Sequence, residues 1–464
     1  MADGAYTNLE LAQALRRARL HGRDAAFVTE IVSGTIRWRG RYDPIIAAAS
    51  SRPVERIDPA VLDTLRLGAH QILAMRVPEH AAVGETVALA RAVNGIGASK
   101  LVNAVLRRIS ERPLETWLEE TVPAEPMTAR LSVMHSHPEW IVKALRQALI
   151  GHGAATPETA DDELERLLLS DNEAPAVHLV ARPGMGAEDE LLEVGATQQA
   201  LAPTAWTLPG GDPGRIAAIR DGRAAVQDAG SQLVALALAA VPLEGRAAES
   251  AAAAERSERW LDLCAGPGGK AGLLAALALQ VGADLVANEV SAHRADLVRS
   301  TLEAVGARAA ELGRTVEIRV GDGREVGTEE PGAFSRVLVD APCTGLGALR
   351  RRPEARWRRQ QSDLATLGPL QRSLLQSALD ATASGGVVAY ATCSPHLAET
   401  TFVVTDVLKR RTDIEVLDAR QFVRDRRGEQ VPGLGEGPAV QLWPHVQGTD
   451  GMFLTLLRRV GDVP

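Results

Sequence analysis

Three cysteines are the residues of this chain whose type and spacing could support covalent chemistry. Cys264, Cys343 and Cys393 lie in the stretches LDLCAGPGGK, LVDAPCTGLG and YATCSP, and the sequence has no other cysteine. Each follows a short apolar run typical of a buried strand and precedes turn-forming residues. One cysteine at a strand end is usually a small buried apolar residue. Two of them behind neighbouring strands instead indicate nucleophilic chemistry, because a thiolate is a strong nucleophile.

The elements that must position these thiols form an alternating series from residue 259 onward. The strand-like segments RWLDLCAG, DLVANEV, TVEIRVGD, FSRVLVDAP and GGVVAYATCS are separated by helix-like segments such as GKAGLLAALALQ. This alternation predicts βαβ units and a mainly parallel, Rossmann-like α/β sheet. Ligands bind such sheets at the carboxyl ends of the strands, and each cysteine lies at such an end.

A glycine-rich loop follows the first of these strands. Gly266, Gly268 and Gly269 stand between strand and helix, where a ligand can approach the backbone and meet free N–H groups. Glu289 and Asp322 end the next two strands, where acids can bind ribose hydroxyls and an adenine edge, although turn or N-cap roles are equally common. The loop is neither a P-loop nor a GxGxxG fingerprint, which favours S-adenosylmethionine over a pyrophosphate cofactor. The predicted cofactor-binding residues are Cys264, Ala265, Gly266, Pro267, Gly268, Gly269, Lys270, Glu289, Asp322 and Asp340.

The first 113 residues form a different pattern, in which apolar residues recur at the three- and four-residue spacing of helices. Asp58 and Pro59 are typical of a helix N-cap followed by proline at the first helical position. This segment has 16 Arg and Lys against 11 Asp and Glu, although the whole chain has a net charge of −8. Its stretches ETVALARAV and KLVNAVLRRI resemble the NusB-like RNA-binding domain of antitermination factors, which implies an all-α RNA-binding domain.

The three cysteine stretches, in their order and spacing, resemble the signature loops of the RNA (cytosine-5)-methyltransferase family over about residues 175–464. The resemblance implies that Cys393 attacks C6 of the cytosine, and that Cys343 helps to release the product. It also implies that Asp340 hydrogen-bonds the N3/N4 edge of the base. We expect Cys264 to pack within the cofactor loop rather than to react. Together with the NusB-like segment, the resemblance implies methylation of 16S ribosomal RNA.

The predicted fold class is a Rossmann-like methyltransferase domain with a mainly parallel sheet, preceded by an all-α NusB-like domain and a small α/β connector. The predicted domains are residues 1–115, all-α and NusB-like, residues 116–226, a helical linker with a small α+β RNA-binding subdomain, and residues 227–464, the catalytic domain.

A basic run, RRRPEARWRR at residues 350–359, begins seven residues after Cys343. A charge run is usually a solvated helix face, but this position predicts contact with RNA phosphates and stacking of a base on the tryptophan. The predicted RNA-binding residues are Arg350, Arg351, Arg352 and Trp357.

Composition limits the remaining possibilities. The chain has no apolar run of about 18 residues, no secretory signal at its start, and no cysteine spacing typical of disulfides or zinc. We therefore expect a cytoplasmic, monomeric protein without a membrane or metal partner. Alternatives are the same chemistry on transfer RNA and a non-catalytic RNA-binding or antitermination protein. A nicotinamide dehydrogenase is disfavoured because its glycine pattern is missing.

Overall fold

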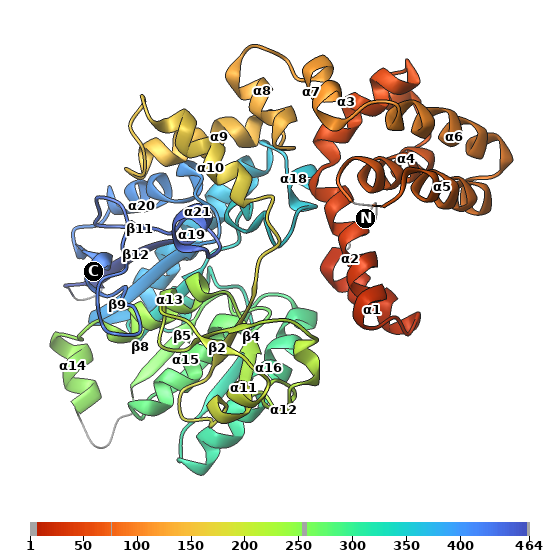
Figure 1. Cartoon of the computed structure of the whole chain (residues 1–464). Coiled ribbons are helices and arrows are strands. Elements are labelled where there is room, and N and C mark those ends of the chain that lie inside the picture. Colours follow the sequence, from red (N-terminus) through yellow and green to blue (C-terminus); the bar gives the residue numbers. More distant parts are fainter. Residues whose placement is uncertain (1–6, 76, 253–257, 462–464) are drawn as a thin grey trace. The chain divides into compact units, whose positions relative to one another are not determined.

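The computed structural model describes residues 7–75, 77–252 and 258–461, which form two compact units (Figure 1). The helical unit extends to Arg146 and also takes Asp161–Glu173 and Leu349–Arg359. The sheet unit takes Gln147–Ala160, Ala174–Ala348 and the chain from Gln360 onward. Both units are thus discontinuous in sequence, whereas the predicted domains are three consecutive segments.

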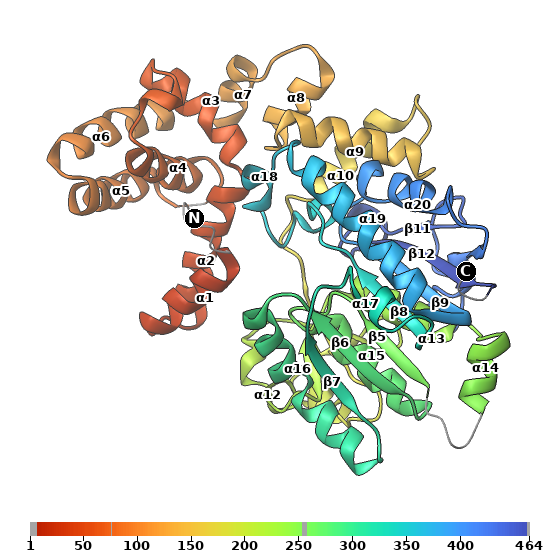
Figure 2. The same ribbon diagram turned by 180° about the vertical axis from the view of Figure 1, so that it is seen from behind.

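The sheet unit contains a large, mostly parallel sheet in the strand order β10-β12-β9-β8-β5-β6-β7, with β11 paired to β12 (Figure 2). β5, β6, β7, β8 and β9 pair in parallel, and β10, β11 and β12 pair antiparallel at one side. The strands are β5 (Arg259–Asp262), β6 (Asp284–Glu289), β7 (Val316–Val320), β8 (Phe334–Asp340), β9 (Thr382–Thr392), β10 (Ile414–Leu417), β11 (Val440–Gln441) and β12 (Phe453–Arg459). The predicted Rossmann-like, mainly parallel sheet is confirmed.

Helices cover both faces of this sheet, because successive strand residues point to opposite sides. In β8, Leu338 packs into the core beneath α13 and α15, whereas Val337 and Val339 pack into the core beneath α19 and α20. Strands buried on both faces explain the unbroken apolar runs in the sequence. The helices of this unit include α13 (Ala229–Ala240), α14 (Gly245–Ala252), α15 (Gly269–Gln280), α16 (Ala292–Glu311), α17 (Val326–Glu329), α19 (Asp363–Ala381), α20 (Thr401–Leu408) and α21 (Pro444–Gln447).

A second, antiparallel sheet precedes the large one in the chain, with the strand order β2-β3-β1-β4. Its strands are β1 (Val177–Ala181), β2 (Thr197–Gln198), β3 (Ala205–Leu208) and β4 (Ala224–Val226), with the short helices α11 (Glu188–Glu193) and α12 (Ala217–Arg220) between them. Gln232 of α13 fastens this sheet, because its Nε2 donates to the carbonyl of Leu179 at 3.1 Å and its Oε1 accepts from Thr204 Oγ1 at 2.7 Å.

The helical unit confirms the helix pattern read from the first 113 residues. Its helices are α1 (Thr7–Arg17), α2 (Gly22–Arg37), α3 (Arg39–Ser50), α4 (Pro59–Leu73), α5 (Glu79–Asn94), α6 (Ile96–Ser110), α7 (Leu114–Thr121), α8 (Met127–Met134), most of α9 (Glu139–Gly151), α10 (Ala160–Ser170) and α18 (Ala355–Arg358). The Asp58 side chain caps α4 as predicted, accepting from the N–H groups of Ala60 and Val61 at 3.0 and 3.3 Å. Leu65 and Leu106 are fully buried between these helices.

Arg356, in the basic run, is completely buried within the helical unit. Its guanidinium donates to the carbonyl oxygens of Asp171 at 2.6 Å and Ser136 at 3.2 Å, and to Asn172 Oδ1 at 2.7 Å. Burial lowers the pKa of Arg356 to about 10, so the side chain keeps its charge near neutral pH. This arginine therefore ties α18 to the segments that follow α8 and α10, as a structural element of the unit.

Replacing Arg356 with methionine should lower the free energy of unfolding of the helical unit by roughly 3 kcal/mol, because several carbonyl acceptors lose a charged donor. Arg356→Lys should also destabilise the unit, since an ammonium cannot reproduce the planar fork. Urea denaturation followed by circular dichroism measures both changes. Arg52→Met, which removes an exposed arginine of the same unit, is the control. Equal unfolding free energies for Arg356→Met and Arg52→Met would contradict the structural role.

Candidate active site

The carboxyl ends of β5, β6, β7, β8 and β9 meet at one edge of the large sheet, because these strands run parallel. The glycine loop follows β5, and the predicted acids follow or end the other strands. Glu289 is the last residue of β6, Asp322 follows β7, and Asp340 is the last residue of β8. Cys343 and Cys393 follow β8 and β9 directly. The structure thus brings the predicted catalytic residues and cofactor residues to one edge of one sheet.

The two cysteines predicted to be catalytic form a close pair, with their Sγ atoms 3.4 Å apart. This is a hydrogen-bonding distance for sulfur. The parallel register of β8 and β9 places Asp340 opposite Ala391, so the loops that follow the two strands leave the sheet side by side. The Gly347 N–H donates to the carbonyl of Cys393 at 2.9 Å and joins the two loops directly. Both thiols can therefore reach the same small substrate group.

Lys270 of the glycine loop supplies the positive charge next to these thiols. Its Nζ donates to Asp340 Oδ2 at 2.9 Å, and its side chain is only 10% exposed. Burial disfavours the ammonium form, but the Asp340 carboxylate and, more weakly, the Cys393 sulfur raise the pKa of Lys270 above its ordinary value. Lys270 therefore stays charged, and Asp340 is held by an ion pair rather than standing alone.

The two sulfurs differ in their surroundings. The hydrogen bond with Cys393 and burial raise the pKa of Cys343 well above the ordinary thiol value, and the charges of Glu399 and Asp340 add to this. Cys343 is therefore held as a thiol, which can donate its proton toward Cys393. Burial also raises the pKa of Cys264 well above the ordinary value, and this residue packs against the core beneath α19. A buried thiol of that kind is a weak nucleophile.

The glycine loop joins β5 to α15. Gly268 has φ of +108°, a conformation that favours glycine, and it precedes the N-terminus of α15. A Cβ atom at Gly266 would lie 2.3 Å from Glu289 Oε2, so no larger residue fits there. Glu289 accepts from the N–H groups of Gly266 at 3.1 Å and Ser291 at 3.0 Å, and fixes the loop. Whether Glu289 also binds a ribose stays a prediction.

Asp322 lies in the turn after β7, with its side chain about one-third exposed. The guanidinium and the backbone N–H of Arg324 donate to its carboxylate, at 3.0 Å for both Nε and N. These bonds lower the pKa of Asp322, so it is an anion near neutral pH. Its predicted contact with an adenine edge is untested.

Asp262, the last residue of β5, is an acid that the sequence did not single out. It is 1% exposed, and neither carboxyl oxygen has a hydrogen-bond partner among the described residues. Burial, followed by the charge of Asp340, raises the pKa of Asp262 to about 7. A buried carboxyl group without a donor fits a cationic ligand, which would favour its ionised form.

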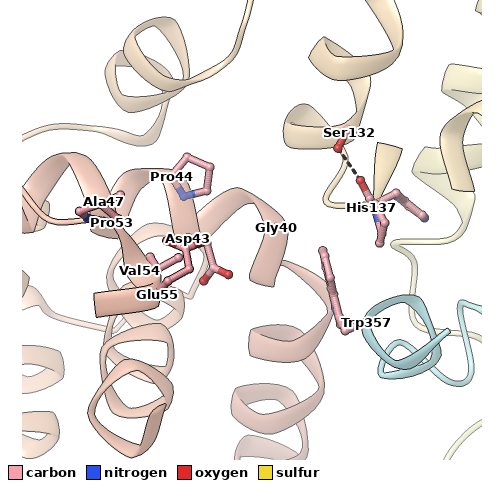
Figure 3. Close-up of a pocket in the computed structure, with 11 residues that line it drawn as sticks. Gly40, Asp43, Pro44, Ala47, Pro53, Val54, Glu55, Ser132, His137 and Trp357 are labelled. Atoms are coloured by element: carbon pink, nitrogen blue, oxygen red, sulfur yellow. Dashed lines mark hydrogen bonds between the residues drawn. The ribbon is translucent and has the colours of Figure 1, made fainter. Parts of the chain in front are cut away.

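The predicted RNA-binding residues belong to the helical unit. Arg350 is buried and Arg352 is exposed. The indole N–H of Trp357 donates to the carbonyl of Ile36 at 2.8 Å, and the Arg39 guanidinium lies 5.3 Å from the ring centroid. Figure 3 shows the ring beside Gly40, at the wall of a pocket of about 390 Å³ that includes Asp43 and Pro44. These contacts anchor the indole, and stacking of a base on it stays a prediction.

No helix within residues 7–75, 77–252 and 258–461 has the length and apolar character to cross a membrane. The same part of the chain contains no group of three or more His, Cys, Asp or Glu side chains arranged to hold a metal ion.

Two protein families match separate parts of the chain. Residues 250–458 match the model of the 16S rRNA methyltransferase RsmB/F family, and residues 1–111 match the NusB family. The first range contains all three cysteines and every predicted cofactor residue. The second confirms the NusB-like character predicted for the N-terminal helices.

Relatives match this chain over nearly its whole length. "Putative methyltransferase Rv1407" of Mycobacterium tuberculosis is 50% identical, over 99% of this chain and 94% of its own length. The ribosomal RNA small subunit methyltransferase B of Pseudomonas syringae is 30% identical over 99% and 94% of the two chains. Among solved structures, PH0851 superposes with a TM-score of 0.74 at 20% identity, covering 97% and 93%. NSun6 from Pyrococcus horikoshii, determined with SFG, gives 0.53 at 16% identity, covering 69% and 98%.

The raised pKa of Asp262 predicts how stability depends on pH. The folded-state pKa of about 7 lies above the unfolded value, so the folded state binds the extra proton. The resulting stabilisation is present below about pH 4 and is lost as the pH rises through about 7. Asp262→Asn cannot ionise, so relative to the unsubstituted protein it should gain up to about 3 kcal/mol between about pH 5 and about pH 8.

Urea unfolding at the two pH values, without added ligand, measures this gain. Asp189→Asn, at an exposed aspartate of α11 in the same unit, controls for the loss of one charge. Parallel pH dependences for Asp262→Asn and the unsubstituted protein would show that Asp262 is ionised throughout and would contradict the prediction.

Proposed function

Because the chain belongs to the 16S rRNA methyltransferase RsmB/F family, we propose that it methylates C5 of a cytosine in 16S ribosomal RNA through a covalent bond between Cys393 and C6. The observation that carries the proposal is the 3.4 Å separation of the Cys343 and Cys393 Sγ atoms at the ends of adjacent parallel strands. One nucleophile needs only one cysteine. A close pair fits a reaction in which one thiol attacks a base and the other assists its release.

Covalent attack solves a problem of reactivity, because C5 of cytosine is too weak a nucleophile to take a methyl group directly. When the Cys393 sulfur bonds to C6, the electrons of the C5–C6 double bond move to C5 and the ring becomes enamine-like. Asp340 then hydrogen-bonds the N3/N4 edge of the base, and Lys270 holds that carboxylate at 2.9 Å. After methylation a base takes the C5 proton, the electrons of that C–H bond re-form the C5–C6 double bond, and Cys393 leaves C6 as a thiolate, with Cys343 assisting this release.

S-adenosylmethionine supplies the methyl group when it is bound. Its cationic sulfonium and ammonium groups fit the buried acid Asp262, which has no donor among the described residues. Its nucleoside part fits the backbone of Gly266 and Gly268, with Glu289 and Asp322 as the acids at the next two strand ends. The residues present therefore fit the charge of this cofactor.

Ribosomal RNA as the substrate is supported by two features of the chain. Relatives named as ribosomal RNA small subunit methyltransferases match it from end to end, and the NusB-like segment accompanies the methyltransferase segment in one chain. The basic run adds positive charge, of which Arg352 is exposed and Arg351 half-buried, whereas Arg350 and Arg356 are buried. Action on ribosomal RNA also implies a cytoplasmic protein.

The two thiols should fail differently when each is replaced. Cys393→Ala should abolish both 5-methylcytidine formation and any covalent protein–RNA adduct, because C5 is never activated. Cys343→Ala should still attack and methylate, then stay bound to its product. Labelled, unmodified 16S ribosomal RNA and S-adenosylmethionine, followed by a denaturing gel and nucleoside mass spectrometry, measure both outcomes.

Cys264→Ala controls for the loss of a thiol as such and should trap no RNA. An adduct in Cys393→Ala but not in Cys343→Ala would reverse the two roles. No adduct in either variant, with turnover retained in both, would exclude the covalent mechanism. Methylation of transfer RNA but not of 16S ribosomal RNA in a parallel reaction would keep the chemistry and overturn the substrate.

Arg351 and Arg352 should contribute to RNA affinity through phosphates. Replacing both with glutamine should reduce the slope of log affinity against log salt by up to about 1.8 on duplex RNA and about 1.4 on single strands, if each makes one phosphate contact. Filter binding over a salt series measures the slope. Arg308→Gln, at an arginine of α16 already paired with Glu311 at 2.7 Å, is the control. An unchanged slope for the double variant would mean that the run is only a solvated face.

A further inference from the structure

Glu399 is a buried acid that the reaction as described does not use. It follows Cys393 by six residues, in the turn Leu397–Glu399 before α20, where an acid is ordinarily an exposed helix-start residue. Here the residue is 0% exposed. A carboxylate in the interior is costly unless donors satisfy it. The contacts of this carboxylate must therefore explain how it is stabilised in the interior.

The carboxylate of Glu399 accepts hydrogen bonds from the residue directly after each of the two active-site cysteines. Thr344, which follows Cys343, donates its backbone N–H at 2.8 Å, and its hydroxyl also contacts the carboxylate. Ser394, which follows Cys393, donates its hydroxyl at 2.6 Å. The Thr344 and Ser394 hydroxyl oxygens also lie 3.2 Å apart. One side chain thus binds both cysteine loops.

Two further contacts hold this arrangement from outside. Gln371 of α19 donates through Nε2 to Glu399 Oε1 at 3.2 Å and to the carbonyl of Pro342 at 2.9 Å, so the residue before Cys343 is fixed as well. The Tyr390 hydroxyl donates to the Glu399 carbonyl at 2.8 Å and fixes the backbone of the acid. All the donors named here are neutral, which leaves the negative charge of the carboxylate uncancelled by a cation.

We propose that Glu399 is a positioning residue that holds the Cys343 and Cys393 sulfurs in register and makes their surroundings unequal. The proposal rests on the proposed function, in which both sulfurs must serve one cytosine. Positioning matters there because attack and release lose rate when a reacting group is displaced by about 1 Å. Short hydrogen bonds to the residues beside both cysteines give such control.

The charges around the pair support the inequality. Lys270 lies on the Cys393 side, where its positive charge favours a thiolate, and the anionic Glu399 acts on the Cys343 side, where it disfavours one. These charges favour Cys343 as the sulfur of the pair that keeps its proton. Removing the Glu399 charge therefore weakens the preference for a protonated Cys343 and also loosens the distance between the two sulfurs.

The equilibrium between the two thiols and their disulfide measures the positioning without any RNA. In this reaction the two thiols lose two protons and two electrons and form one S–S bond, while one oxidised glutathione is reduced to two glutathione molecules. The full-length protein carrying Cys264→Ala has only the two relevant thiols. It is equilibrated in glutathione buffers, quenched by alkylation, and analysed by mass spectrometry.

Glu399→Gln should lower the equilibrium constant for disulfide formation at least about tenfold, because the loops lose the acceptor that holds the sulfurs together. Glu399→Asp keeps the charge on a shorter side chain and should restore part of the effect. Gln232→Met is the matched control, since it removes side-chain hydrogen bonds of another fully buried residue that bonds Leu179 and Thr204. It should lower the melting temperature and leave the equilibrium constant unchanged.

Methylation kinetics then separate this proposal from the proposed function. Glu399→Gln should reduce kcat at least about tenfold with a smaller change in KM for RNA, because binding contacts are unaffected. An equilibrium constant equal to that of the parent protein would overturn the positioning role, whatever the turnover. A shifted constant in a protein that forms no RNA adduct in any variant would sustain the positioning role and overturn the covalent mechanism instead. An equally large shift of the equilibrium constant in Gln232→Met would mean that Glu399 affects the sulfurs only through general stability, and would overturn the positioning role.

Discussion

The parallel pairing of β8 with β9 is the constraint on which the active site depends. Asp340 lies opposite Ala391 in this register. Cys343 follows Asp340 by three residues, and Cys393 follows Ala391 by two. Side chains alternate between the faces of a sheet, so a slip of one residue would turn every side chain of a strand to the other face. The apolar residues of β8 and β9 fill cores on both faces and make such a slip costly. Core packing thereby sets the distance between two sulfurs.

Burial of charge is the second theme of the structure, and three acids illustrate three solutions. Asp340 is paired with the Lys270 ammonium, Glu399 is surrounded by neutral donors, and Asp262 has neither among the described residues. An ion pair or a set of donors offsets most of the desolvation cost, whereas an acid without either shifts its pKa. The least satisfied of the three lies beside the glycine loop, where a cationic cofactor would complete it. The acid without a donor among the described residues is thus the candidate for binding the cofactor, whereas the two acids with partners hold parts of the protein in place.

The sequence predicted the elements and the residues that stand at strand ends. Helical and strand periodicity located the first helices and the parallel sheet, and the position of a residue after a strand was enough to place Cys343, Cys393 and Glu289 at one edge. These predictions succeed because they depend on local pattern and on the common direction of parallel strands.

The remaining features depend on pairings between distant parts of the chain, which local pattern does not encode. The partner of Lys270 is 70 residues away, and the donors that hold Glu399 come from three segments. The charge of the basic run predicts a solvated or RNA-binding face, yet two of its six arginines, Arg350 and Arg356, are buried. Arg356 lies in α18, where a short helix can turn one side chain inward. Composition gives the charge of such a run, and only the fold shows which of its side chains point into the protein and which point to solvent.

A pair of thiols at hydrogen-bonding distance has a property that neither thiol has alone. Two anionic sulfurs 3.4 Å apart would repel each other strongly, so the first ionisation of the pair suppresses the second. The pair therefore presents one thiolate and one proton donor, and the question is only which sulfur takes which state. The hydrogen bond between the sulfurs, burial and the charge of Glu399 raise the pKa of Cys343, which favours Cys343 as the protonated member of the pair. In the proposed reaction, the division of labour between nucleophile and releasing group would follow from the placement of buried charges around the two sulfurs.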